Sequence, residues 1–250
     1  GLLYARGGSE ATTQGASSDQ TVDFGNDDWQ KRVHSGTRPV VASTKWVNKD
    51  GKSVTAPALG FTGLDVILKV NQTLAPTPIG NLTLLQQKQL LEARRLHNFV
   101  PSISDNGWHY WRPNDKKSTK VIIEYLSHKE KPIPWLSLRG FSGSRLEGKK
   151  PESIRLTVEG KPPYSFNLKE ATIWSGESGS WHGIQAHLKG KDLEWVEKNL
   201  PSAESVYYRF DADHKSESAE IDARELALIK EAIACYMVHR AIYDAENPKK

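Results

Sequence analysis

Sulfur-containing residues are nearly absent from this chain, which has one cysteine and one methionine in 250 residues. The single cysteine, Cys235, excludes an internal disulfide framework and any metal site built from several cysteines. Long apolar runs are missing too: none approaches the ~20 residues that a helix needs to cross a bilayer. We therefore expect no membrane-spanning helix. Low sulfur content, eight tryptophans and a polar start rich in Ser and Gly favour an exported protein, periplasmic or extracellular, over a cytosolic enzyme.

The chain is nevertheless apolar enough to fold, with 37% hydrophobic and 26% charged residues. Its charge is unevenly distributed. Residues 1–30 hold five Asp/Glu against one Arg, whereas residues 109–170 hold thirteen Lys/Arg against seven Asp/Glu. A basic middle attracts anionic partners such as nucleic acid or cell-envelope polymers. The explanation that we favour is a solvated surface with lysines on strand edges.

Composition divides the chain into two parts. Residues 1–36 are polar and poor in apolar side chains, so we interpret them as a flexible lead in which only Trp29 is suited to dock on the body. Residues 37–247 are expected to form a single strand-rich globular domain.

Periodicity within 37–247 predicts mostly strands. Residues 40–47 and 53–60 form a hairpin around Asp50-Gly51, and a strand follows at 65–70. The segment NLTLLQQKQLLEARRLHNF predicts a helix, with Thr83 and Gln86 at the spacing of a capping box. Further strands are expected near 120–126, 134–141, 153–159, 164–168, 171–175, 182–188 and 205–211.

Two more helices complete the prediction. KDLEWVEKNL forms a short one, and residues 222–245 form a C-terminal amphipathic helix whose apolar stripe includes Leu226, Ile229 and Ile233. The fold class is therefore α+β and mainly β: an antiparallel sandwich or barrel-like sheet with one internal helix and the C-terminal helix packed on it.

Four of the eight tryptophans lie in two short motifs, WHYW and WSGESGSW. Exposed aromatic rings stack on sugars or bases, and loop glycines let a ligand approach the backbone. The competing explanation, which we favour, is that these tryptophans fill the β core. The ligand-binding candidates are Trp108, His109, Trp111, Trp174, Glu177, Trp181 and His182.

No complete catalytic or metal-binding motif is present. GFSGS and GESGS resemble a nucleophile elbow but lack its closing glycine, and Cys235 lies in the middle of a predicted helix among apolar residues. His182 and His187 are five apart on one strand and so face opposite ways. Residues 211–222 match a calcium loop poorly and are interpreted as a solvated turn. We predict no catalytic residue, cofactor or metal.

These observations favour a non-enzymatic exported protein that binds a glycan or a protein partner of the bacterial envelope. The alternative is a hydrolase of cell-wall glycan or peptide, with Glu124, Glu177 or His182 as its acid/base group. Nucleic-acid binding through the basic middle is a weaker alternative, because acids interrupt that region and no recognition motif is present.

Overall fold

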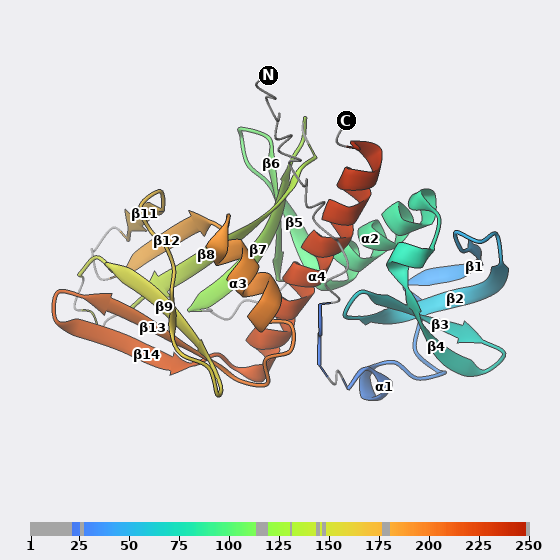
Figure 1. Ribbon diagram of the computed structural model, residues 1–250, viewed down its shortest axis with the longest axis horizontal. Coiled ribbons are helices and arrows are strands. Elements are labelled where there is room, and N and C mark those ends of the chain that lie inside the picture. Colours follow the sequence, from blue (N-terminus) through green and yellow to red (C-terminus); the bar gives the residue numbers. More distant parts are fainter. Residues whose placement is uncertain are drawn as a thin grey trace, which may run out of the picture.

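The computed structural model describes residues 22–25, 28–113, 120–130, 132–143, 146, 149–176 and 181–248. These residues form three antiparallel sheets and four α-helices (Figure 1). The predicted α+β, mainly β class is confirmed. Within the described ranges, no helix is long and apolar enough to cross a membrane.

The first sheet has four strands in sequence order: β1 (Val41–Val47), β2 (Ser53–Thr62), β3 (Asp65–Val70) and β4 (Thr73–Pro78). The predicted hairpin and third strand are present. β4 was not expected, because Pro76 and Pro78 disfavour a strand and are tolerated here only because β4 is at the sheet edge. Asn71 and Gln72 form the turn before it, both with positive φ.

Helix α2 (Leu84–Asn98) follows the short 3₁₀ helix η1 (Ile79–Asn81) and packs on this sheet. The predicted capping box is wrong, since Thr83 makes no side-chain cap. Gln86 instead completes the free edge of β1: its amide donates to the Lys45 carbonyl at 2.7 Å and its oxygen accepts from the Val47 N–H at 3.0 Å. Gln86 bonds to the β1 backbone instead of capping α2, because the backbone groups of an edge strand would otherwise be unpaired.

Part of the expected flexible lead packs onto the first sheet. Helix α1 (Trp29–Arg32) is followed by Val33, which is buried in a small cluster with Leu59 and Ile67, and Trp29 packs against the same cluster. The docking expected for Trp29 is therefore present. Residues 1–21 and 26–27 lie outside the described residues.

The second sheet has six strands in the order β11-β12-β8-β7-β6-β5. Their bounds are β5 (Phe99–Ile103), β6 (Trp108–Pro113), β7 (Val121–His128), β8 (Pro134–Ser142), β11 (Thr172–Ser175) and β12 (His182–His187). β5 and β6 fall in the aromatic, turn-rich stretch for which no strand was predicted. Pro101 obscures the β5 pattern and is accommodated because β5 is an edge strand.

The third sheet contains β9 (Ser153–Val158), β10 (Tyr164–Ser165), β13 (Val206–Ala212) and β14 (Lys215–Glu220) in the order β10-β9-β13-β14. The alternation predicted for β9 is confirmed, since Ile154, Leu156 and Val158 are buried. The solvated turn expected over 211–222 is largely a hairpin, with Asp213 and His214 at its tip in positive φ. Strand β14 is polar and is recognisable only from its backbone pairing with β13.

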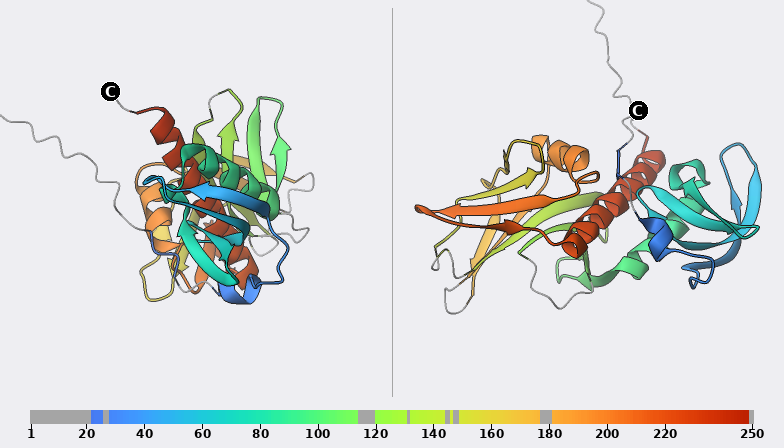
Figure 2. Two further views of the ribbon diagram at one scale, coloured as in Figure 1. Left: turned by 90° about the vertical axis from the view of Figure 1, so that its right-hand side faces the viewer. Right: turned by 90° about the horizontal axis from the view of Figure 1, so that it is seen from below.

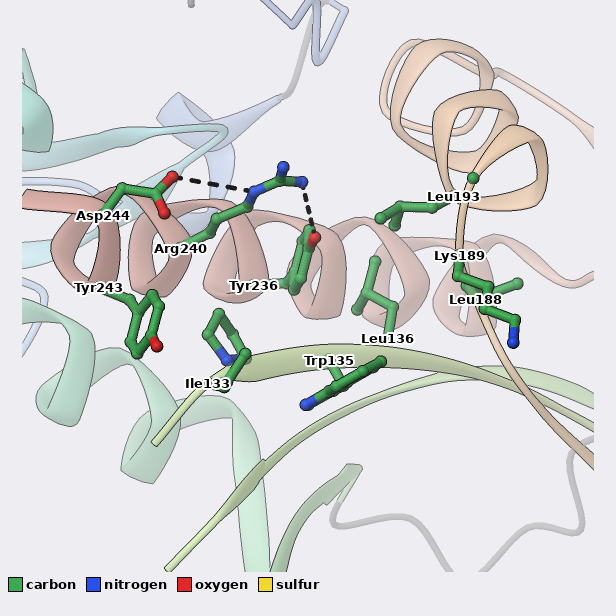
Figure 3. Close-up of a pocket in the computed structure, with 12 residues that line it drawn as sticks. Ile133, Trp135, Leu136, Leu188, Lys189, Leu193, Tyr236, Arg240, Tyr243 and Asp244 are labelled. Atoms are coloured by element: carbon green, nitrogen blue, oxygen red, sulfur yellow. Dashed lines mark hydrogen bonds and ion pairs between the residues drawn. The ribbon is translucent and has the colours of Figure 1, made fainter. Parts of the chain in front are cut away.

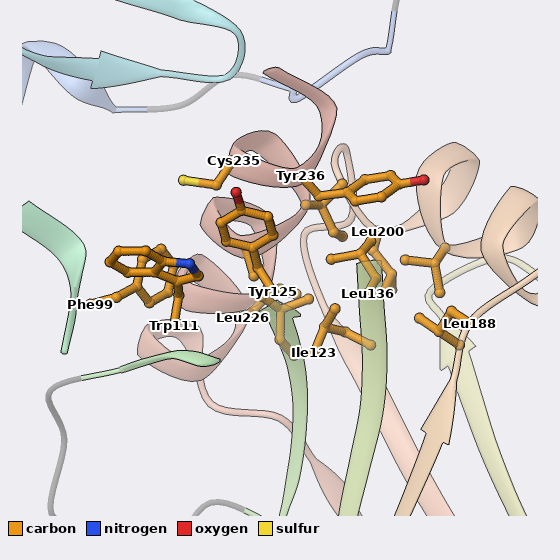
Figure 4. Packing of buried hydrophobic residues seen from close by; sticks show 14 of the residues in the cluster. Phe99, Trp111, Ile123, Tyr125, Leu136, Leu188, Leu200, Leu226, Cys235 and Tyr236 are labelled. Atoms are coloured by element: carbon orange, nitrogen blue, oxygen red, sulfur yellow. The ribbon is translucent and has the colours of Figure 1, made fainter. Parts of the chain in front are cut away.

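Helices α3 (Lys191–Asn199) and α4 (Ala223–Glu246) complete the core. Asp222 caps α4 by accepting the Glu225 N–H at 2.8 Å. α4 packs on β7 and β8 and against α2, so it lies between the six-stranded sheet and the first sheet (Figures 1 and 2). Figure 4 shows Tyr125, Ile123 and Leu136 packed near this helix. Cys235 is fully buried there, and burial raises the pKa of its thiol, as expected for a core cysteine.

Candidate functional site

The two faces of the six-stranded sheet differ sharply. The covered face packs against α4 and the third sheet, and its apolar centre is 0–6% exposed. It is formed by Trp111, Ile123, Tyr125, Leu136, Leu138 and Ile184. The alternate positions form the opposite face, which we call the aromatic face. Its aromatic, charged and amide members are Trp108, Tyr110, Arg112, Glu124, His128, Trp135, Arg139, Phe141, Trp174, Gln185 and His187. Ile122, Leu126 and Ser137 lie on the same side, and Leu126 and Ser137 are 0% exposed.

One end of the aromatic face is a cluster of indole and imidazole rings. The Trp108 ring lies 5.2 Å from His128, 6.0 Å from His187 and 6.4 Å from Trp135, centroid to centroid. Partial burial and the nearby Lys189 lower the pKa of His187. Most of these rings are partly exposed, so they present both apolar surface and polar edges to solvent.

The centre of the aromatic face is a buried carboxylate held by two guanidinium groups. Glu124 is 0% exposed, and its Oε1 accepts from Arg112 Nε and from Arg139 Nη1, each at 3.0 Å. Its Oε2 accepts from the Gln185 amide at 3.4 Å. The three strands β6, β7 and β8 bring these groups side by side, because Arg112 and Arg139 occupy neighbouring positions on the strands that flank β7.

The other end is a second aromatic cluster. Arg139 lies over the rings of both Phe141 and Trp174, 5.0 Å from each centroid. Phe141 contacts Trp174 at 6.1 Å and Trp181 at 6.3 Å. Trp181 is 39% exposed. Arg112 lies over Tyr110 in the same way. The aromatic face therefore carries two clusters of rings, one at each end, with the charged centre between them and buried Leu126 and Ser137 beside it.

Two glycines allow the indoles at this end to lie against the backbone. A Cβ on Gly183 would come within 2.2 Å of the Trp174 ring, and one on Gly176 would come within 2.2 Å of the Trp181 ring. Any larger residue would displace the indole, so glycine is required at both positions for this arrangement.

The structure separates the predicted site residues. Trp108, Trp174 and Trp181 contribute to the partly exposed surface, and the two tryptophan motifs therefore meet on one face. Trp111 is buried on the covered face, and His109 and His182 point to that side as well, because side chains alternate along a strand. These three residues therefore lie on the opposite side of the sheet from Trp108, and their role in ligand binding stays a prediction. Glu177 lies outside the described residues.

Trp111 belongs to a buried network rather than to a ligand site. It stacks on Tyr125, centroid to centroid at 6.4 Å (Figure 4). Arg95 lies 4.8 Å from the centroid of the Trp111 ring. Arg95 and the Tyr125 hydroxyl both hydrogen-bond to Nδ1 of His239. Burial, reinforced by the Arg95 charge, lowers the pKa of His239 to about 3, and burial raises the pKa of Tyr125. This network connects α2 and α4 to the sheet.

A pocket of about 280 Å³ lies between α4, the start of α3 and the start of β8 (Figure 3). Arg240 pairs with other groups in and beside the pocket. Arg240 donates to the Tyr236 hydroxyl at 2.9 Å and lies 3.6 Å from Glu197 and 4.0 Å from Asp244. Figure 3 shows Trp135 on the side of β8 that points away from α4, toward the aromatic face.

Metal chemistry is not favoured by the described part of the chain, in which no group of three or more His, Cys, Asp or Glu side chains is arranged to hold an ion. Comparison of the chain with family models, curated protein sequences and solved structures finds no match. The aromatic face is therefore the feature of the described residues from which a function can be proposed.

Sequence reasoning missed most of this face. Glu124 was considered only as a catalytic acid, and Tyr110, Arg112, Trp135 and Arg139 were not considered. The sequence signal for this face is the period-2 alternation in β6, β8 and β12. Along these strands, aromatic, charged or small polar residues alternate with residues that point to the covered side. It was not recognisable without knowing which strands are neighbours.

Proposed function

We propose that this protein is a non-enzymatic carbohydrate-binding protein and that an oligosaccharide lies along the aromatic face. The observation that carries the proposal is the layer of two aromatic clusters, with Trp108 and Trp135 at one end and Trp174 at the other, on either side of the Arg112–Glu124–Arg139 centre. An exported, envelope-associated location, as the composition favours, belongs to the same proposal.

The chemistry of this layer suits sugars. The C–H faces of a sugar ring pack on partly exposed indoles, while the hydroxyls at its rim need planar donors and acceptors. Arg112, Arg139 and Gln185 supply donors, and their positions are held by Glu124 before any ligand arrives. Preorganised groups of this kind reduce the entropy lost on binding.

The length of the layer favours a chain of sugars over a monosaccharide. Trp135 and Phe141 are six residues apart on β8, which at the usual rise of a strand is ~20 Å. A ligand that reaches both aromatic clusters must therefore contain several linked rings.

Hydrolysis is less well supported. Glu124 accepts hydrogen bonds from two guanidinium groups, an arrangement suited to a carboxylate, whereas a general acid must carry a proton. Glycosidases also use a second carboxyl group, and Glu124 is the single acid among the described residues of this face.

The test is isothermal titration calorimetry and affinity electrophoresis with soluble peptidoglycan fragments and a panel of other oligosaccharides. We expect Trp174→Ala to weaken binding at least ~10-fold, the equivalent of about 1.4 kcal/mol for a lost stacking platform. Tyr207→Ala is the matched control, because Tyr207 is an exposed aromatic residue (45%) on the third sheet. Absence of binding to every glycan would overturn the proposal, and so would an equal effect of the two variants.

A further inference from the structure

The centre of the aromatic face carries an excess of positive charge. Two guanidinium groups share a single carboxylate, so the triad of Arg112, Glu124 and Arg139 has a formal charge of +1. Glu124 is fully buried, whereas the Arg112 side chain is 41% exposed and that of Arg139 is 19% exposed. The unbalanced charge is therefore on the solvent side of the triad.

Glu124 uses only part of each guanidinium. It bonds to Nε of Arg112 and to Nη1 of Arg139. Among the described residues, the two Nη groups of Arg112 and the Nη2 group of Arg139 have no hydrogen-bond acceptor. Both guanidinium planes are held by stacking, Arg112 over Tyr110 and Arg139 over Phe141 and Trp174. A guanidinium fixed in this way presents a fork of donors that matches a carboxylate.

We propose that the ligand is an acidic oligosaccharide, one whose sugars carry carboxylate groups, and that one carboxylate binds Arg112 through its Nη groups beside Arg139. This inference rests on the proposed carbohydrate-binding function. The ligand carboxylate neutralises the triad, while the neighbouring rings pack on Trp108 and Trp135 at one end and on Trp174 and Trp181 at the other.

The distribution of cations distinguishes this ligand from nucleic acid. A single-stranded nucleic acid carries a phosphate at every nucleotide and binds grooves in which positive charge follows the backbone. In the described part of the aromatic face, both arginines lie at the centre. One end consists of Trp and His rings, including His128 and His187, and the other consists of Phe and Trp rings. One central anion position fits an acidic sugar unit better than a repeated phosphate.

The experiment is calorimetry of the full chain at 150 mM salt, on the order of physiological ionic strength. It uses three classes of probe: oligogalacturonate and hyaluronan oligosaccharides as acidic glycans, cellohexaose and chitohexaose as neutral ones, and oligo-dT as the nucleic acid. We expect the acidic glycans to bind at least ~10-fold more tightly than the neutral ones, about 1.4 kcal/mol. Arg112→Gln should abolish this preference, and Arg112→Lys should restore it only in part, because lysine lacks the fork.

The matched control is Arg155→Gln, which removes an arginine of similar exposure (42%) from an ion pair with Asp211 on the third sheet. It changes net charge as Arg112→Gln does and should leave the preference intact. Equal binding of neutral and acidic glycans would overturn the inference and leave the proposed function standing. Binding of no glycan overturns the proposed function itself, and Arg112-dependent binding of oligo-dT alone overturns both in favour of nucleic acid.

Discussion

The covered face and the aromatic face belong to the same six-stranded sheet and differ in almost every physical property. Along β8, Leu136 and Leu138 are fully buried on the covered face, whereas Trp135 and Arg139, which flank this pair on the aromatic face, remain partly exposed; Ser137 between the two leucines is buried. The covered face follows the usual rule that apolar side chains leave water. The aromatic face keeps large rings and charges at the solvent boundary, which folding alone does not require and which the proposed ligand binding would use.

The two faces also treat polar groups differently. On the covered side, the His239–Tyr125–Arg95 network is buried and its members bond to one another. On the aromatic side, Glu124 is buried but its arginine partners reach solvent. The first arrangement connects helices to the sheet, and the second leaves guanidinium donors at a partly exposed surface, where the proposed ligand would bind.

Leu136→Ala compared with Trp135→Ala tests the contrast most strongly. Removing Leu136 leaves a cavity under α4 and should lower the free energy of unfolding by ~2–5 kcal/mol. Trp135→Ala should cost less than half as much, because the ring is partly solvated, and should instead weaken glycan binding. Urea denaturation and calorimetry measure the two effects. Equal stability losses would mean that the aromatic face is a second core.

Glu124→Ala should have the next largest effect. The substitution leaves two arginines without their carboxylate, and we expect a loss of ~1–3 kcal/mol, below the 3–5 kcal/mol typical of a broken buried pair, because both guanidinium groups reach water. Binding of acidic glycans should fall as well, since the guanidinium groups are no longer held. Glu124→Gln keeps a hydrogen-bond acceptor, so its free energy of unfolding should lie between those of wild type and Glu124→Ala. An alanine variant as stable as wild type would show that the triad does not stabilise the fold.

The stability of the fold should depend on pH through His239, which packs on the covered face from α4. Its folded pKa of about 3 is below the ordinary 6.5, so the unfolded chain takes up the proton first. The stability linked to neutral His239 is thus complete above pH 6.5 and is lost as the pH falls toward 3, by up to ~1.4 kcal/mol per pH unit. His239→Gln should show a shallower decline in urea midpoint between pH 6.5 and pH 4. Parallel curves for variant and wild type would contradict this prediction.

Gly183→Ala should have the smallest effect on stability and a clear one on the aromatic face. The added Cβ displaces the Trp174 indole, which can rotate toward solvent, so we expect a stability change within ~1 kcal/mol. Near-UV circular dichroism should change and glycan affinity should fall. Gly80→Ala is the control, because a Cβ there meets no atom within 4 Å. An unchanged spectrum for Gly183→Ala would show that Trp174 is not seated on this glycine.

Local patterns in the chain were sufficient for much of the fold. β2, β3, β8, β9 and β12, together with α2, α3 and α4, were predicted to within a few residues, because their alternation or helical periodicity is strong and burial follows it. The burial of Cys235 and the opposite orientation of His182 and His187 were also predictable, since each depends on a neighbour within one helix or strand.

Tertiary context decided the rest. β4 and β5 contain prolines and β14 is polar, so each is a strand only because a neighbouring strand pairs with its backbone. Gln86 serves β1 rather than α2 for the same reason.

The sequence by itself determined which residues are aromatic, which are charged, and on which positions of a strand they alternate. Only the tertiary structure decided that Trp108 and Trp174, separated by more than sixty residues of chain, lie on one face, and that Trp111 lies on the other. Strand order and register set which side chains meet, and they depend on contacts between distant segments, which no local pattern of residues encodes.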